Sequence, residues 1–150
     1  MTRIFPHLFA YKIEHIKNNL NNFINLGFSE QEIINLFHII PDLDLITPEE
    51  IYTLLNILHQ IGCTKPTIKH IINSNPFYLT RIDTDVINLI NQLKIYGFSN
   101  LNHLFEINPY LLNKDVFEIK DFFNKINKTI SQEQIIFLLE NNPFLIDELN

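Results

Sequence analysis

The sequence predicts an all-α fold, a helical-repeat solenoid built from about four similar repeats. Three observations predict it: prolines recur at a regular spacing, glycines recur in phase with them, and the apolar residues between them follow a helical period. Self-similarity with a period of about 34 residues is typical of solenoids. In such folds a repeat buries its apolar face only by stacking on its neighbours.

Five prolines mark the boundaries of the repeats. They are spaced 35, 35, 33 and 34 residues apart, at Pro6, Pro41, Pro76, Pro109 and Pro143. A glycine lies 21 residues beyond each of the first three, at Gly27, Gly62 and Gly97. We therefore divide the chain into repeats at about 6–40, 41–75, 76–108 and 109–142, with a partial repeat at 143–150. We expect all of them to form one domain.

Each repeat is expected to begin with a long amphipathic helix. In the second repeat its apolar stripe consists of Ile51, Leu54, Leu55 and Leu58, a spacing that places the four side chains on one helix face. The first repeat has one polar interruption of this stripe, Asn19. The segment Thr47-Pro48-Glu49-Glu50 predicts a helix start, because it combines a capping hydroxyl, a proline at the first helical position and acidic residues near the positive end of the dipole.

A second, shorter helix precedes the next proline of the series. Its start is predicted by capping boxes, which pair Ser29 with Glu32 and Ser131 with Gln134. A short apolar pair then follows the proline, as in Leu111-Leu112, and predicts a tight turn or a 3₁₀ helix. Each repeat should therefore contain two helices and one 3₁₀ turn.

The composition indicates an ordered globular chain. Of its 150 residues, 46% are hydrophobic and 12% aromatic, which is enough to form a core. A single cysteine, Cys63, excludes an intramolecular disulfide. No apolar run is long enough to predict a transmembrane helix, and the first residues do not resemble a signal or transit peptide. We expect an intracellular protein without a membrane partner, and the compartment stays open.

The segments around the glycines resemble the repeat of the mitochondrial transcription termination factor (mTERF) family. They read LGFSEQEIINLFHIIP, IGCTKPTIKHIINSNPFYL and YGFSNLNHLFEINPYLL. The family repeat has a leucine-glycine-serine opening and a proline followed by leucines, and the resemblance runs from Pro6 to Leu149. It implies two helices and a 3₁₀ turn per repeat. It further implies a superhelix whose concave groove binds the phosphate backbone of double-stranded DNA or, in some members, of RNA.

The charge is unevenly distributed along the chain. The formal net charge is −6, but residues 63–128 carry eight basic and six acidic side chains. Phosphate binding relies on lysine and arginine, so this segment contains the candidate nucleic-acid-binding residues. They are Lys65, Lys69, Arg81, Lys94, Lys114, Lys120, Lys125 and Lys128. Arg81 and Lys114 each lie five residues past a repeat proline, and we expect them to be neighbours. A solvated surface balanced by nearby acids is the alternative interpretation.

Other kinds of site find no support in the sequence. The six histidines show no HExxH or Cys-His metal spacing, so we expect no metal and no cofactor. There is no Gly-rich phosphate loop, no G-x-S-x-G turn and no paired carboxylate arrangement. We expect no catalytic residues, no small-molecule substrate and no enzymatic activity.

Two hypotheses about function follow. The first is a non-catalytic module that contacts the phosphate backbone of DNA or RNA, in the regulation of transcription or gene expression. The second is a protein–protein interaction scaffold with an acidic concave surface. Basic residues on the concave face would favour the first and acidic residues the second. The sequence leaves open the choice among DNA, RNA and protein, the sequence specificity and the oligomeric state.

Overall fold

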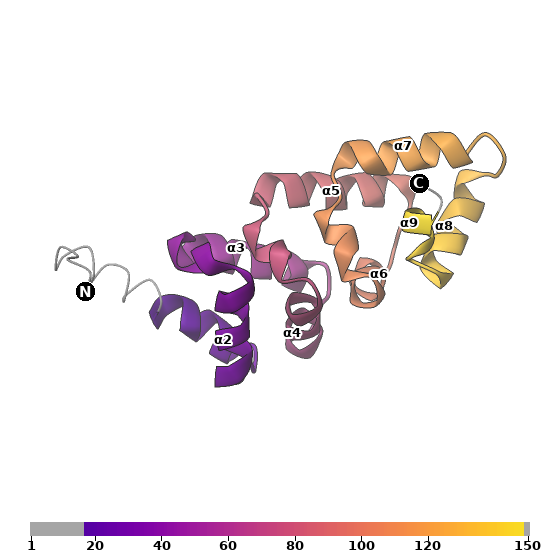
Figure 1. Cartoon of the computed structure of the whole chain (residues 1–150). Helices are drawn as coiled ribbons and strands as arrows, with labels where there is room; N and C mark the ends of the chain where they lie inside the picture. The colour runs from indigo at the N-terminus through magenta and orange to yellow at the C-terminus, as the bar shows by residue number, and fades with distance from the viewer. Residues whose placement is uncertain (1–16, 149–150) are drawn as a thin grey trace. The chain divides into compact units, whose positions relative to one another are not determined.

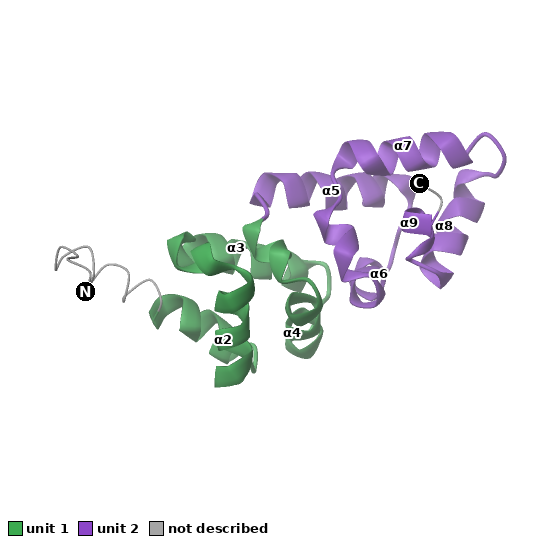
Figure 2. Ribbon diagram, in the orientation of Figure 1, with its two compact units in different colours: residues 1–80 green, residues 81–150 purple. Residues whose placement is uncertain are grey.

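The computed structural model describes residues 17–148, which form α-helices, 3₁₀ helices and turns (Figure 1). The all-α fold with a recurring helix and 3₁₀ turn is confirmed. The chain divides between Thr80 and Arg81 into two compact units (Figure 2). We call them the N-terminal half and the C-terminal half and describe each by itself. The expectation of a single domain stays a prediction.

The described part of the N-terminal half contains two pairs of helices, each pair followed by a 3₁₀ helix. Its elements are a helix over residues 17–25, α2 (Glu30–Ile39), η1 (Pro41–Leu45), α3 (Pro48–Gln60), α4 (Lys65–Ser74) and η2 (Pro76–Thr80). Ile51 and Leu58 of α3 and Leu79 of η2 are fully buried. The apolar stripe predicted for α3 therefore faces the core.

The C-terminal half repeats the same order of elements. They are α5 (Asp83–Tyr96), α6 (Leu101–Ile107), η3 (Pro109–Asn113), α7 (Val116–Ile126), α8 (Gln132–Asn141) and α9 (Leu145–Glu148). The segment after Pro143 differs from the expected 3₁₀ helix. There the Glu148 N–H donates to the Phe144 carbonyl at 3.3 Å, an i→i+4 bond that makes α9 a turn of α-helix.

The predicted helix starts are confirmed by their hydrogen bonds. The Ser29 hydroxyl accepts from the Glu32 N–H at 3.2 Å, and the Ser29 N–H donates to the Glu32 carboxylate at 3.0 Å. Ser131 and Gln134 form the same box in α8. The Thr47 hydroxyl caps α3 by accepting from the Glu50 N–H at 3.1 Å. Each cap satisfies a backbone donor that the helix itself leaves unpaired.

Gly97 shows why glycine recurs between the two helices of a repeat. It ends α5 in the left-handed conformation with φ +113°, which L side chains rarely adopt. A Cβ at this position would also lie 3.2 Å from Cδ1 of Ile136. A side chain there would be both strained and crowded.

Asn19, the polar interruption of the first stripe, is fully buried. Its amide donates to the Ile46 carbonyl at 3.0 Å, so it joins one repeat to the next. Asn108 is also fully buried and donates to the Pro143 carbonyl at 3.1 Å. Buried polar groups need such partners, and here they bond the backbone of another repeat.

Residues 1–16 lie outside the described part of the chain, and so do the predictions made for Pro6, for the apolar pair that follows it and for Ile16. Across residues 17–148, the helices are all too short or too polar to span a membrane.

Candidate functional site

Arg81 and Lys114 lie next to each other, as the repeat spacing predicts, and both make internal contacts. The Arg81 guanidinium donates to the carbonyls of Leu112 and Lys114, at 3.1 Å each. The Lys114 ammonium lies 2.9 Å from the Asp147 carboxylate and 3.6 Å from that of Glu118. The two cations therefore join successive repeats within the C-terminal half: Arg81 is held by backbone carbonyls, and the charge of Lys114 is paired with two carboxylates.

Two further lysines of the predicted set form ion pairs. Lys125 lies 2.9 Å from Asp121, one turn earlier on α7. Lys69 on α4 lies 3.0 Å from Glu32, which Asn73 also contacts at 2.7 Å. The backbone N–H of Ser29, followed by Lys69 and Asn73, lowers the pKa of Glu32 from 4.5 to about 2. The Lys69–Glu32 pair thus joins α4 to the start of α2.

The other four predicted residues are exposed and form no ion pair with another described residue. Lys65 is the first residue of α4, Lys94 lies in the last turn of α5, Lys120 is on α7 and Lys128 follows α7. Phosphate contacts are made by cations that protein acids have not already neutralised. These four lysines are therefore the strongest candidates within the predicted set.

The N-terminal half has a surface hollow of about 240 Å³ next to Lys65. We call it the Tyr52 hollow. Its lining comes from the end of the 17–25 helix, from α3 and from the start of α4, and consists of Asn22, Asn25, Leu26, Tyr52, Leu55, Asn56, His59, Lys65 and Ile68. Apolar walls with a few convergent polar groups are the usual features of a ligand site.

The equivalent place in the C-terminal half is occupied by aromatic rings. Leu26 and Tyr96 both precede a repeat glycine, and Leu55 and Phe123 both lie 14 residues past a repeat proline. The rings of Tyr96 and Phe123 stack with centroids 3.9 Å apart and an interplanar angle of 4°. Burial raises the pKa of Tyr96, against a smaller opposing effect of a hydrogen bond with Gln92.

Gln132 completes the contrast between the two places. It is the first residue of α8, as Lys65 is of α4. Its side-chain amide donates to the backbone carbonyl of Tyr96, one of the two stacked residues, at 2.7 Å. The same repeat position thus holds an amide bonded to the backbone in one half and an exposed cation in the other.

Sequence reasoning missed an asparagine that recurs in the first helix of each repeat. The residue 15 positions beyond each repeat proline is an asparagine in all four repeats: Asn21, Asn56, Asn91 and Asn124. None of the four is buried, and Asn56 lines the Tyr52 hollow. Asparagine is a poor helix former, so its recurrence on an exposed helix face was a signal available in the sequence.

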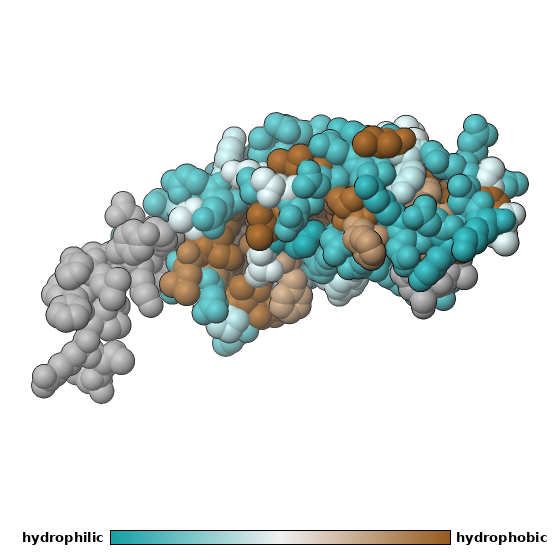
Figure 3. All heavy atoms as spheres, turned by 90° about the horizontal axis from the view of Figure 1, so that it is seen from above, coloured by the Kyte–Doolittle hydropathy of each residue, from teal (hydrophilic) through white to brown (hydrophobic). Residues whose placement is uncertain are grey.

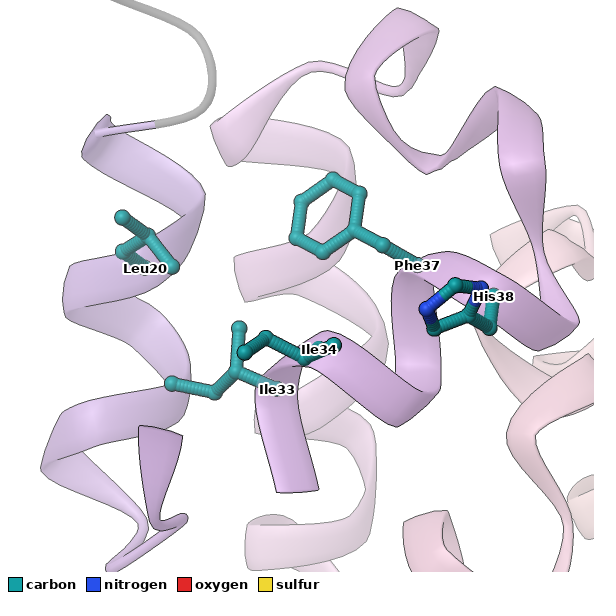
Figure 4. A pocket seen from close by; sticks show the side chains of 5 residues that line it. All are labelled: Leu20, Ile33, Ile34, Phe37 and His38. Atoms are coloured by element: carbon teal, nitrogen blue, oxygen red, sulfur yellow. The ribbon is translucent and has the colours of Figure 1, made fainter. Parts of the chain in front are cut away.

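Other surface features are less suited to nucleic acid. A hollow of about 380 Å³ next to α2 is lined by four apolar side chains and His38 (Figure 4). Apolar side chains also interrupt the polar surface (Figure 3). Phe117 and Ile95 are the most exposed of the large apolar side chains described, at 77% and 74%. Within residues 17–148, no three histidine, cysteine, aspartate or glutamate side chains come together in a way that suits a metal ion.

Comparison with known proteins agrees with the repeat architecture. Residues 1–147 match the family model described as mTERF. No match to the chain was found among curated proteins.

Proposed function

Because the chain belongs to the mTERF family, we propose that it is a non-catalytic nucleic-acid-binding module that contacts the phosphate backbone of DNA or RNA. Regulation of transcription or of gene expression is the role we infer for it. The observation that carries the proposal is the family match over residues 1–147, since this is a family of nucleic-acid-binding helical-repeat proteins.

The exposed lysines are the proposed phosphate contacts. Lys94, Lys120 and Lys128 belong to the C-terminal half, and Lys65 belongs to the N-terminal half. Of the remaining predicted cations, Arg81, Lys69 and Lys114 join repeats to one another, and Lys125 pairs with Asp121 within α7. The C-terminal half carries six basic and ten acidic side chains, so attraction to phosphate must be local rather than a property of net charge.

Fluorescence anisotropy with a labelled DNA duplex and a labelled RNA hairpin tests the proposal. With about four phosphate contacts, affinity should fall on the order of 100-fold between about 50 and 200 mM salt. A triple variant, Lys94→Gln with Lys120→Gln and Lys128→Gln, should bind weakly and lose most of this salt dependence. The matched control replaces the same three residues by arginine, which keeps the charge and should keep the binding.

Absence of binding to either nucleic acid at low salt would contradict the proposal. Equal affinity of the glutamine and arginine variants would contradict the assignment of these three lysines.

A protein–protein interaction scaffold is the second candidate. The exposed Phe117 and Ile95 and the net charge of −6 favour it, because apolar side chains at a polar surface and an acidic chain suit a basic, partly apolar partner. If the acidic surface is the functional one, the protein should bind a basic peptide in a salt-dependent manner and should not bind nucleic acid.

A further inference from the structure

We propose that the Tyr52 hollow binds one unpaired base of a single-stranded nucleic acid, with Lys65 against a neighbouring phosphate. This inference rests on the proposed function and deepens it, because it names a site and the form of nucleic acid that the site takes. Phosphate contacts alone do not distinguish paired from unpaired strands, whereas a pocket for a base does.

The lining of the hollow has the chemistry that an unpaired base requires. Tyr52 is 62% exposed and offers a ring face, while Leu26, Leu55 and Ile68 form apolar walls. Aromatic faces stack on bases of any sequence, and the apolar walls exclude water from the base.

Three asparagine side chains add hydrogen-bonding groups to the same hollow. The amide nitrogen of Asn22 donates to the Pro48 carbonyl at 3.3 Å, which orients its side chain and leaves its carbonyl oxygen as an acceptor. Asn25 and Asn56 lie beside it. A primary amide presents a donor and an acceptor together, and this pattern matches the edges of bases.

The C-terminal half shows that this place in the repeat accommodates a planar ring. There Tyr96 occupies the position of Leu26 and stacks on Phe123 at 3.9 Å. In the N-terminal half both positions hold leucine, and a hollow of about 240 Å³ lies beside them. A base of the ligand would therefore occupy the place that the ring of Tyr96 occupies in the C-terminal half.

Lys65 distinguishes the hollow from a simple packing defect. At the equivalent position, Gln132 bonds the backbone beside the stacked rings. Lys65 is exposed at the rim, forms no ion pair with another described residue and lies where the strand on either side of a bound base would carry phosphate. A cation beside an aromatic wall is the combination that single-strand binding surfaces use.

The test compares two labelled ligands in anisotropy titrations of the full chain. One is a ten-nucleotide oligothymidylate or oligouridylate, and the other is an abasic strand with the same number of phosphates. Stacking and hydrogen bonding of one base should make the base-containing strand bind about tenfold more tightly.

Variants locate the effect. Tyr52→Ala should remove most of the preference for the base-containing strand, because it removes the stacking surface, whereas Tyr110→Ala, which removes a ring that is 54% exposed in the C-terminal half, should leave it unchanged. The double variant Leu26→Tyr with Leu55→Phe copies the stacked pair into the hollow and should abolish the preference. Because Tyr52 and Tyr110 are exposed, circular dichroism should show that these two variants fold even if the double variant does not.

The outcomes separate the two proposals. Equal binding of the base-containing and abasic strands, or equal effects of Tyr52→Ala and Tyr110→Ala, would overturn the inference and leave the phosphate-binding function intact. Failure to bind any strand or duplex at low salt would overturn both.

Discussion

The two halves of the molecule use the same positions of one repeat for different purposes. In the C-terminal half, Tyr96 stacks on Phe123, and Gln132 donates to the backbone carbonyl of Tyr96. In the N-terminal half, Leu26 takes the place of Tyr96 beside an open hollow. Both halves repeat the same order of paired helices and 3₁₀ helices, apart from the α-helical turn α9 at the end of the second, so the repeat backbone does not depend on how these positions are occupied. A solenoid of this kind thus separates the residues that build the repeat from those that are available for a ligand.

The basic residues divide in the same way. Arg81 and Lys114 bond to the following repeat and lie inside the packing between repeats. Lys65 and Lys94 occupy exposed helix ends and have no acidic partner among the described residues. Charge is structural in the first pair and available to a ligand in the second.

The largest expected difference between the halves concerns their cores. Phe123→Ala removes a ring that contacts Tyr96, Phe98 and Phe122 and should lower the free energy of unfolding by about 3–5 kcal/mol. Leu55→Ala, beside the open hollow, should cost about 2 kcal/mol, the low end for such a change. Urea unfolding of both variants measures the difference, and equal losses would show that the hollow is not a gap in the packing.

A smaller effect is expected at the buried asparagine that joins two repeats. Asn108→Ala leaves the Pro143 carbonyl without its donor and should lower the free energy of unfolding by about 1–3 kcal/mol. Asn88→Ala, on the exposed face of α5, is the control and should be neutral or slightly stabilising. If thermal unfolding shows the same stability for both variants, the inter-repeat hydrogen bond contributes nothing.

Glu32, whose carboxylate accepts from the Ser29 N–H of the capping box and pairs with Lys69 of α4, should give stability a dependence on pH. The pKa of Glu32 is lowered from 4.5 to about 2 on folding, so its contribution is fully present above pH 4.5 and is lost as the pH falls toward 2. Glu32→Gln should flatten this part of the curve of unfolding free energy against pH. Glu30→Gln, two residues earlier, is the control, and an unchanged curve in the Glu32 variant would contradict the assignment.

The smallest expected change concerns the asparagine that recurs on the exposed helix face. Asn91→Ala and Asn124→Ala should each raise the free energy of unfolding by a few tenths of a kcal/mol, up to about 0.7, because alanine is the better helix former. The same variants should bind nucleic acid more weakly if this face contacts the ligand. Asn88→Ala, on α5 like Asn91, should give the stability gain without a loss of affinity. If none of the three variants changes the affinity, this helix face does not contact the nucleic acid.

Sequence reasoning recovered the features that depend on residues close together in the chain. The capping boxes at Ser29 and Ser131, the helix start at Thr47 and the 3₁₀ helices after Pro41, Pro76 and Pro109 follow from local backbone chemistry. The repeat period also predicted that Arg81 and Lys114 lie next to each other. All of these rest on spacing, which the sequence displays directly.

The features that the sequence did not reveal depend on side chains from different repeats. That Lys69 pairs with Glu32, 37 residues away, is decided by how α4 packs against the start of α2. The Tyr52 hollow arises because leucines stand where the other half has aromatic rings, a comparison that needs the paired positions to be seen together. For the candidate site, the sequence therefore supplied Lys65 as a phosphate contact, which stays a prediction, but did not indicate the pocket beside it.

The most direct test of the account is an NMR titration of the isotope-labelled full chain with the ten-nucleotide oligouridylate. We predict that the largest shifts occur around the Tyr52 hollow, at the side-chain amides of Asn25 and Asn56 and the backbone amide of Lys65. Smaller shifts are expected near Lys94 and Lys120, where only phosphate is contacted. Shifts confined to the C-terminal half, or no shifts at a ligand concentration that saturates binding, would contradict it.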